Sequence, residues 1–190
     1  MSGFPKIFLS LIVAMLCALP LGNVFAGDID FKDFNLKGTP KKFEVSTRIE
    51  YKLTDYLRDA LKNGVTLNTR VQIRLGEHSS WWFNKDIPIL TVNYQLKYHA
   101  LSRHYVLSKI DTNEHWNFSS LSASLRKLGE SRRYELPDIT EFLKDGDDGE
   151  FYIFAIADMA PATLRLPLRI QSLFNDQYRL TSEGVLWPLP

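Results

Sequence analysis

Histidine is the first side chain to consider for chemistry, because its charge changes near neutral pH and it binds metals. The chain contains four histidines, which are His78, His99, His104 and His115. They form neither a His-x-His pair nor a helical His-Glu-x-x-His motif. His99 and His104 flank a predicted turn at 100–103, so their side chains could approach each other across a hairpin. A zinc site would still need a ligand such as Glu77 or Asp86. We therefore expect no metal site, and a hydrolase that uses His99 or His104 with a carboxylate is only an alternative.

Other catalytic signatures are also missing from the sequence. There is no Gly-x-Ser-x-Gly elbow and no glycine-rich phosphate loop. The stretch 145–150, Asp-Gly-Asp-Asp-Gly-Glu, partly resembles a calcium loop, but its twelfth position is Ile156, where a bidentate Glu is required. We interpret it as an acidic turn. The sequence therefore predicts a protein that is not an enzyme, with no catalytic residues and no cofactor.

Two groups of residues are candidates for binding a partner. Trp81 and Trp82 are adjacent, and neighbours on a strand face opposite ways, so one indole could be exposed. Exposed Trp and Arg often carry binding energy. Trp187 could supply a stacking partner, and burial of both indoles is the alternative.

The second group is basic and lies around the end of a predicted helix. Its members are Arg126, Lys127, Arg132 and Arg133. Cations near a helix C-terminus complement the helix dipole, which explains Arg126 and Lys127 structurally. The functional hypothesis is a contact for lipid phosphates or for an acidic partner.

Residues 1–26 have the pattern of an export signal. Lys6 provides the positive start, an apolar run extends from Ile7 to Leu19, and Ala26 ends a small-x-small cleavage site. A membrane anchor is the alternative, but a spanning helix needs about 20 apolar residues and this run is shorter. We expect cleavage, a mature chain that starts near Gly27, and a periplasmic location.

Charge and cysteine content narrow the functions of the exported part. Removing Lys6 from the 23 basic residues leaves 22 against 22 acidic ones, which argues against nucleic acid as a partner. Membrane contact is then expected only at the surface or through an uncleaved signal. The single cysteine, Cys17, lies in the signal, so the exported chain has no disulfide and no thiolate nucleophile.

After residue 26, apolar residues recur mostly at every second position, which is typical of strands with one buried face. The clearest case is 90–98, and similar patterns occur at the positions 43–51, 65–75, 164–170, 178–181 and 185–187. The segment 151–157 is apolar on both faces, which favours a central, covered strand. We therefore predict that residues 27–190 form a single, mainly β domain, an antiparallel β-sandwich-like fold with two or three short helices.

Three helices are expected between the strands. Thr54 can cap the first, whose apolar stripe contains Leu57 and Leu61 and which ends at Asn63-Gly64. Ser119 or Ser120 can cap the second. Its stripe consists of Leu121, Leu125 and Leu128, and it ends at Gly129. Asp138 with Glu141 resembles a capping box for the third, whose stripe consists of Ile139, Phe142 and Leu143.

The segment 51–65, Tyr-Lys-Leu-Thr-Asp-Tyr-Leu-Arg-Asp-Ala-Leu-Lys-Asn-Gly-Val, resembles a known family. Trp81-Trp82 and the stretches 94–101 and 164–169 support the likeness. The chain is similar, over its whole predicted mature part, to the proteobacterial exported proteins of domain of unknown function 4390. That resemblance implies a Gram-negative envelope and suggests a gene near an envelope sensor kinase, but no catalytic residue.

These observations together predict a non-enzymatic periplasmic binding or regulatory protein. We expect its partner to be an envelope protein, such as a membrane sensor kinase or an assembly component. The alternative binding function is a carrier of a lipid or small apolar ligand, because long strands such as 90–98 could wall a cavity.

Overall fold

The computed structural model describes residues 27–78, 85–130, 132–144, 150–162 and 178–189. These residues form the strands β1 (Asp28–Thr39), β2 (Lys42–Lys52), β3 (Leu67–His78), β4 (Lys85–His99), β5 (His104–Lys109), β6 (Glu114–Phe118), β7 (Arg132–Glu135), β8 (Glu150–Pro161), β9 (Leu180–Thr181) and β10 (Val185–Pro188). They also form the helices α2 (Asp55–Lys62), α3 (Leu121–Leu128) and α4 (Thr140–Lys144). The predicted signal at 1–26 and the strand expected at 164–170 lie outside the described residues.

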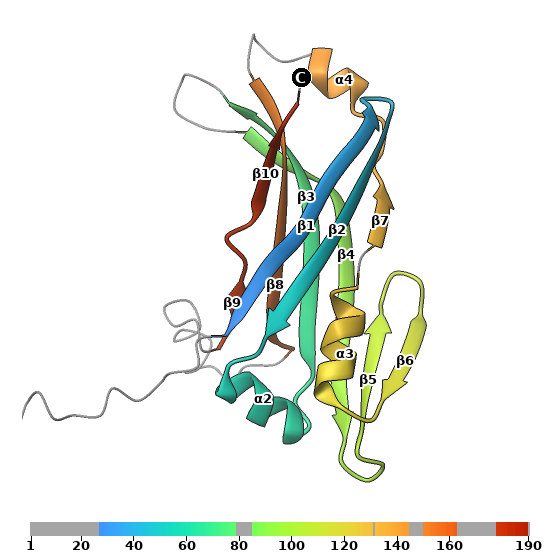
Figure 1. Cartoon of the computed structure of the whole chain (residues 1–190), viewed down its shortest axis with the longest axis vertical. Coiled ribbons are helices and arrows are strands. Elements are labelled where there is room, and N and C mark those ends of the chain that lie inside the picture. The colour runs from blue at the N-terminus through green and yellow to red at the C-terminus, as the bar shows by residue number, and fades with distance from the viewer. Residues whose placement is uncertain (1–26, 79–84, 131, 145–149, 163–177, 190) are drawn as a thin grey trace, which may run out of the picture.

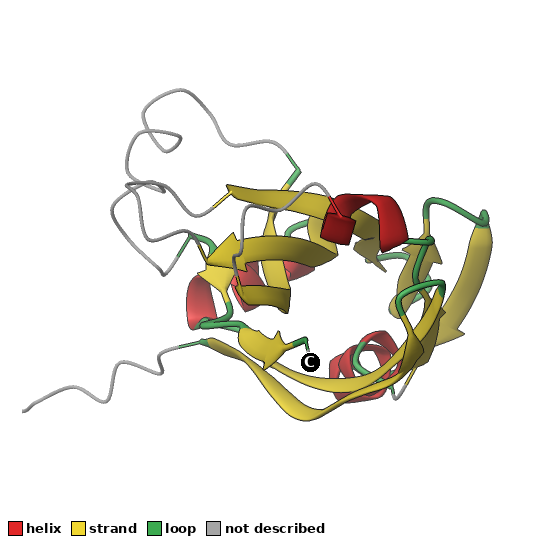
Figure 2. Ribbon diagram, turned by 90° about the horizontal axis from the view of Figure 1, so that it is seen from above, coloured by secondary structure: helices red, strands yellow, loops and turns green. Residues whose placement is uncertain are grey.

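The strands form two antiparallel sheets (Figure 1). The smaller sheet has the order β1-β2-β7. The larger has the order β10-β8-β3-β4-β5-β6, with β9 also paired to β8. Seen from above, the curved sheets face each other around the core (Figure 2). The mainly β, sandwich-like fold expected from the period-two patterns is therefore confirmed.

Strand β2 shows how the sequence produces the smaller sheet. Its odd-numbered positions from Phe43 to Tyr51 are all buried, Val45 fully so, whereas the even-numbered positions are exposed or half-buried. The β1–β2 pairing shifts between Phe31 and Asp33, which marks a bulge at this point of β1. A bulge interrupts the alternation of side chains. Here it brings the Lys32 ammonium to 3.3 Å from Glu50 on β2.

The larger sheet is built around β3, which pairs with β4 on one side and β8 on the other. Its inward positions carry apolar side chains such as Leu67, Val71 and Ile73. The expected alternation of 90–98 is confirmed in β4, where Val92, Tyr94 and Leu96 are buried. The expectation that β8 is covered on both faces is only half right. One face of β8 is fully buried, whereas apolar residues on the other are half-buried.

The three predicted helices are confirmed, and the first two have the expected caps. The Thr54 side chain accepts a hydrogen bond from Leu57 N at 3.1 Å, and Ser120 accepts one from Ala123 N at 3.3 Å. At α4 the Asp138 carboxylate accepts from Thr140 N at 2.8 Å. The predicted apolar stripe of α4 is partly wrong, because Phe142 is 51% exposed.

The helices lie at different places around the sandwich (Figure 1). α2 lies at one end, where Leu57 and Leu61 join the larger core cluster. α4 lies at the other end, next to Ile139, which belongs to the second core cluster. α3 lies beside β2 and contacts the β5–β6 hairpin, so it bridges the two sheets. No helix among the described residues is long and apolar enough to cross a membrane.

Candidate functional site

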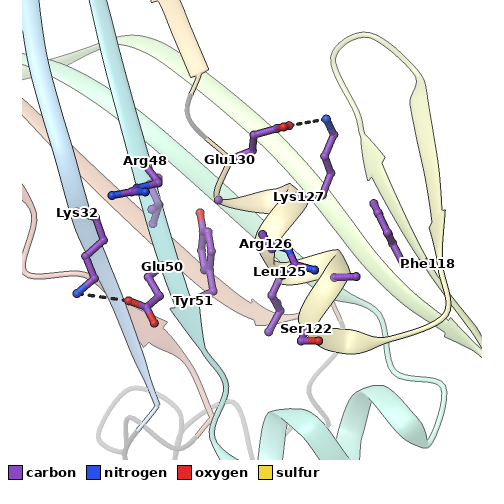
Figure 3. Close-up of a pocket in the computed structure, with 13 residues that line it drawn as sticks. Lys32, Arg48, Glu50, Tyr51, Phe118, Ser122, Leu125, Arg126, Lys127 and Glu130 are labelled. Atoms are coloured by element: carbon purple, nitrogen blue, oxygen red, sulfur yellow. Dashed lines mark hydrogen bonds and ion pairs between the residues drawn. The ribbon is translucent and has the colours of Figure 1, made fainter.

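A groove of about 900 Å³ lies between β2 and α3. We call it the β2–α3 groove (Figure 3). Its apolar lining residues include Phe118 and Leu125, which are half-buried, and Ile49 and Tyr51, which are buried. Its charged residues are Lys32, Arg48, Glu50, Arg126, Lys127 and Glu130. Four of these six side chains are cations and two are anions.

Most of the rim charges are paired. Lys32 contacts Asp30 at 2.5 Å and Glu50 at 3.3 Å, and the hydrogen bond to Asp30 is the main cause that raises the pKa of Lys32. Arg48 pairs with Asp33 at 2.8 Å.

On the α3 side of the groove, only one of the two cations has a partner. The hydrogen bond from Lys127 to Glu130 lowers the pKa of the Glu130 carboxyl. Arg126 is exposed and has no hydrogen bond or ion pair within the described residues. Arg126 is therefore available to a ligand.

The groove depends on a close approach of α3 to β2. Ile49 N donates a hydrogen bond to Gly129 O at 3.0 Å, directly after the helix. A Cβ atom on Gly129 would lie 1.7 Å from Ile49 O, so only glycine allows this contact. The predicted helix stop at Gly129 is thus also the point where α3 joins the strand.

The four basic residues predicted as one partner-binding cluster do not form a single patch. Arg126 and Lys127 line the groove. Arg132 and Arg133 belong to β7, a short strand that the sequence did not reveal, and they face opposite ways because strand neighbours alternate. Arg133 is exposed, whereas Arg132 is half-buried and turned inward.

Arg132 lies at the centre of a group of tyrosines inside the sandwich. We call Arg132, Tyr51, Tyr94 and Tyr134 the Arg132 cluster. The guanidinium carbon is 5.0 Å from the centre of the Tyr94 ring, and Arg132 Nη2 donates to Lys127 O at 3.2 Å. The same guanidinium is 5.7 Å from the Trp116 ring, which Lys127 approaches at 5.5 Å. Arg132 is therefore held between the two sheets by aromatic contacts.

Burial dominates the chemistry of the three tyrosines. It raises the pKa of Tyr51, Tyr94 and Tyr134, and the positive charge of Arg132 opposes that rise in each. The hydroxyl of Tyr51 and the Nε of Arg132 are buried without a hydrogen-bond partner in the described part of the chain, whereas the buried Tyr94 hydroxyl lies close enough to that of Tyr134 to affect the pKa of both groups. Thr47 Oγ1 is also buried and unpaired, and Thr47 is the register partner of Arg132.

The three histidines whose side chains the structure describes, His99, His104 and His115, form no cluster with acidic residues there. His99 and His104 are register partners across the predicted turn, and both are exposed. His104 Nδ1 is hydrogen-bonded to Ser102 O, and His115 Nδ1 to Ser108 Oγ at 2.8 Å. Over the described ranges, no group of three His, Cys, Asp or Glu side chains could hold a metal ion.

Trp81 and Trp82 lie outside the described residues, as does the acidic turn at 145–149. Trp187, suggested as their stacking partner, is 38% exposed on β10. Its ring centre lies 6.3 Å from that of Phe34 on β1. Trp187 therefore takes part in a contact between the two sheets.

Sequence reasoning missed the tyrosines of the Arg132 cluster. Tyr51 and Tyr94 both lie on the apolar side of alternating strands, so each was assigned to the core. The available signal was the hydroxyl, because a buried Tyr usually finds a hydrogen-bond partner for it. The presence of a hydroxyl does not show which other strand carries the residue that lies next to it in the folded protein.

Comparison with known proteins identifies a family for this chain. No curated protein and no solved structure matches the chain. One family model matches residues 26–188, which include every described strand and helix. The chain therefore belongs to the family described as "Domain of unknown function (DUF4390)".

Proposed function

We propose that this protein is a non-enzymatic binding protein, exported to the periplasm, which docks an acidic segment of another envelope protein in the β2–α3 groove. The observation that supports the proposal is the composition of the groove. It combines an apolar surface at Phe118 and Leu125 with a rim whose charges are mostly paired and in which the exposed Arg126 is unpaired within the described residues. Apolar surface provides affinity, and complementary charge selects the partner and speeds association.

Site-specific cross-linking tests this function. A photoreactive amino acid replaces Ser122, which is exposed and lines the groove, and in a control protein it replaces Lys97, which is exposed on β4. Both proteins are exported in living cells, irradiated and purified, and the cross-linked peptides are sequenced. We expect one recurrent envelope protein at position 122 but not at position 97, joined through a peptide rich in Asp and Glu. An envelope sensor kinase is the first partner to examine, given the family resemblance.

Charge reversal tests the role of Arg126. Arg126→Glu is compared with Lys62→Glu, since both residues lie in the last turn of a helix and lose similar dipole interactions. We expect Arg126→Glu to weaken binding of the cross-linked peptide at least about fivefold, and the loss to shrink as salt screens the charges. Equal binding by the two variants, or a cross-linked peptide without acidic residues, would refute the acidic-segment proposal.

A further inference from the structure

The Arg132 cluster contains more hydrogen-bonding capacity than its own residues use. Tyr94 is 1% exposed and Tyr51 is 5% exposed. The Tyr51 hydroxyl is unpaired within the described residues, and the Tyr94 hydroxyl, which lies next to that of Tyr134, still has its own proton to donate. Arg132 uses Nη2 for the Lys127 carbonyl, while its Nε is buried and unpaired. Buried polar groups in folded proteins are nearly always hydrogen-bonded, so unpaired groups gathered at one place indicate a binding role.

The charge of the cluster is also unbalanced. Arg132 has no ion pair with any Asp or Glu of the described residues. Its neighbours are phenol and indole rings, at 5.0 Å for Tyr94 and 5.7 Å for Trp116. These rings stabilise a cation but leave its N–H groups free to donate. The interior thus presents one positive charge and several hydrogen-bond donors, and no carboxylate of the described residues forms an ion pair with that charge.

We propose that Arg132, Tyr51 and Tyr94 form an interior binding site for a carboxylate group. A carboxylate carries one negative charge and accepts two parallel hydrogen bonds from a guanidinium, so it matches a single arginine in charge and geometry. A phosphate dianion would leave one buried negative charge without a partner. The phenol hydroxyls donate to the remaining carboxylate lone pairs, for which Thr47 is a further donor.

The β2–α3 groove provides the approach to this site. Tyr51 lines the groove, while its hydroxyl is one of the unpaired groups of the Arg132 cluster. Lys127 also lines the groove, and its carbonyl accepts the hydrogen bond from Arg132. Arg132 does not itself line the groove, so the carboxylate of a ligand whose apolar body lies against Phe118 and Leu125 must pass Tyr51 or Lys127 to reach it. We therefore assign the ligand class as a carboxylic acid with a linear apolar body.

Three probes separate the parts of this proposal. Laurate carries both the charge and the apolar chain, acetate carries the carboxylate alone, and dodecanol carries the chain without the charge. Binding to the full exported chain is measured by calorimetry and by NMR of the Arg132 Nε–H and the Trp116 indole. We expect saturable laurate binding, weaker acetate binding, and a shift of the Arg132 Nε–H signal with both acids. Absence of saturable binding of both acids at millimolar concentration, or equal binding of dodecanol and laurate, overturns the proposal.

The matched variants are neighbours on β7. Arg132→Gln should abolish binding of the acids, whereas Arg133→Gln, at the adjacent exposed position, should leave it unchanged. Arg132→Gln also loses the contacts of Arg132 with the Tyr94 and Trp116 rings. Tyr51→Phe is a milder test, because the hydroxyl that it removes has no hydrogen-bond partner among the described residues. We expect Tyr51→Phe to keep the thermal unfolding temperature and to weaken laurate binding about tenfold, as for one hydrogen bond to a charged group.

The Arg126→Glu variant distinguishes this site from the proposed protein-docking function. Arg126 lies on the rim that laurate must pass, so laurate affinity in this variant is not the readout; Arg126→Glu should lose the partner peptide, whereas saturating laurate should still shift the Arg132 Nε–H signal. Unchanged laurate affinity in Arg132→Gln would overturn the carboxylate site and leave the docking proposal standing.

Discussion

The guanidinium of Arg132 lies 5.0 Å from the centre of the Tyr94 ring, and this contact joins the two sheets of the sandwich. Arg132 comes from β7 in the smaller sheet, and Tyr94 comes from β4 in the larger one. The pairing places a cation among phenol groups that are themselves buried. It therefore affects both the ligand that the interior can hold and the response of the protein to alkaline pH.

The first prediction concerns that alkaline response. Burial raises the pKa of Tyr51, Tyr94 and Tyr134 above the ordinary value of 10.0, so these phenols keep their protons where the unfolded chain loses them. The folded state then binds more protons, and the free energy of unfolding must fall as pH rises above about 10, by up to about 1.4 kcal/mol per pH unit for each tyrosine. Urea unfolding at a series of alkaline pH values measures the slope. Tyr51→Phe should flatten the slope, and an unchanged slope would contradict the assignment.

A second prediction tests the contact of α3 with β2. Gly129→Ala places a Cβ 1.7 Å from Ile49 O, so the helix must move away from the strand. We expect a loss of about 3 kcal/mol in the free energy of unfolding, as for overpacking of a rigid contact. Gly64→Ala is the control, because a Cβ there meets nothing within 4 Å and costs only the strain of a positive φ, about 1 kcal/mol. Denaturant unfolding and hydrogen exchange of the Ile49 amide provide the measurement. The contact would be refuted by a Gly129→Ala protein as stable as Gly64→Ala.

A third prediction concerns the end of the sandwich closed by α2. Leu57 is fully buried in the larger core cluster, so Leu57→Ala removes packed methyl groups and leaves a cavity. The free energy of unfolding should fall by about 2–5 kcal/mol. Leu101→Ala, at a fully exposed turn position, should change it by less than about 0.5 kcal/mol. If the two leucine variants unfold at the same denaturant concentration, α2 does not pack as described.

The fourth prediction concerns the export signal inferred from residues 1–26. Mass spectrometry of the protein released from the periplasm should give a chain that begins near Gly27. Ala26→Leu replaces the small residue before the cleavage point, and we expect this variant to retain residues 1–26 and to remain with the membrane. Recovery of the unchanged protein with residues 1–26 attached would support a permanent anchor instead.

The parts of the fold that were predictable are those that depend on nearby residues. Thr54 bonds to Leu57 N three residues later, so the start of α2 is visible in a short stretch of sequence. The alternation in β4 is likewise a local property of one strand. The sequence did not reveal strands β1, β5, β6 and β7, and for β1 and β7 the physical reason is visible in the structure. β1 contains a bulge that interrupts its alternation, and β7 is only four residues long with three charged side chains.

The candidate site was predictable only in part. The sequence placed Arg126 and Lys127 near the end of a helix, and both line the β2–α3 groove. It also grouped Arg132 and Arg133, which β7 separates onto opposite faces. Their separation required knowing that 132–135 pairs with β2, a partner almost ninety positions away in the chain.

By itself, the sequence determined the mainly β class, the period-two faces of the long strands and the caps of the helices. Each depends on interactions within a few residues, so the local order of side chains suffices. Only the tertiary structure decided that Arg132 turns inward, that it meets Tyr94 from the other sheet, and that α3 forms a groove with β2. Those contacts join segments far apart in the chain, and their register follows from burying the apolar faces of both sheets at once.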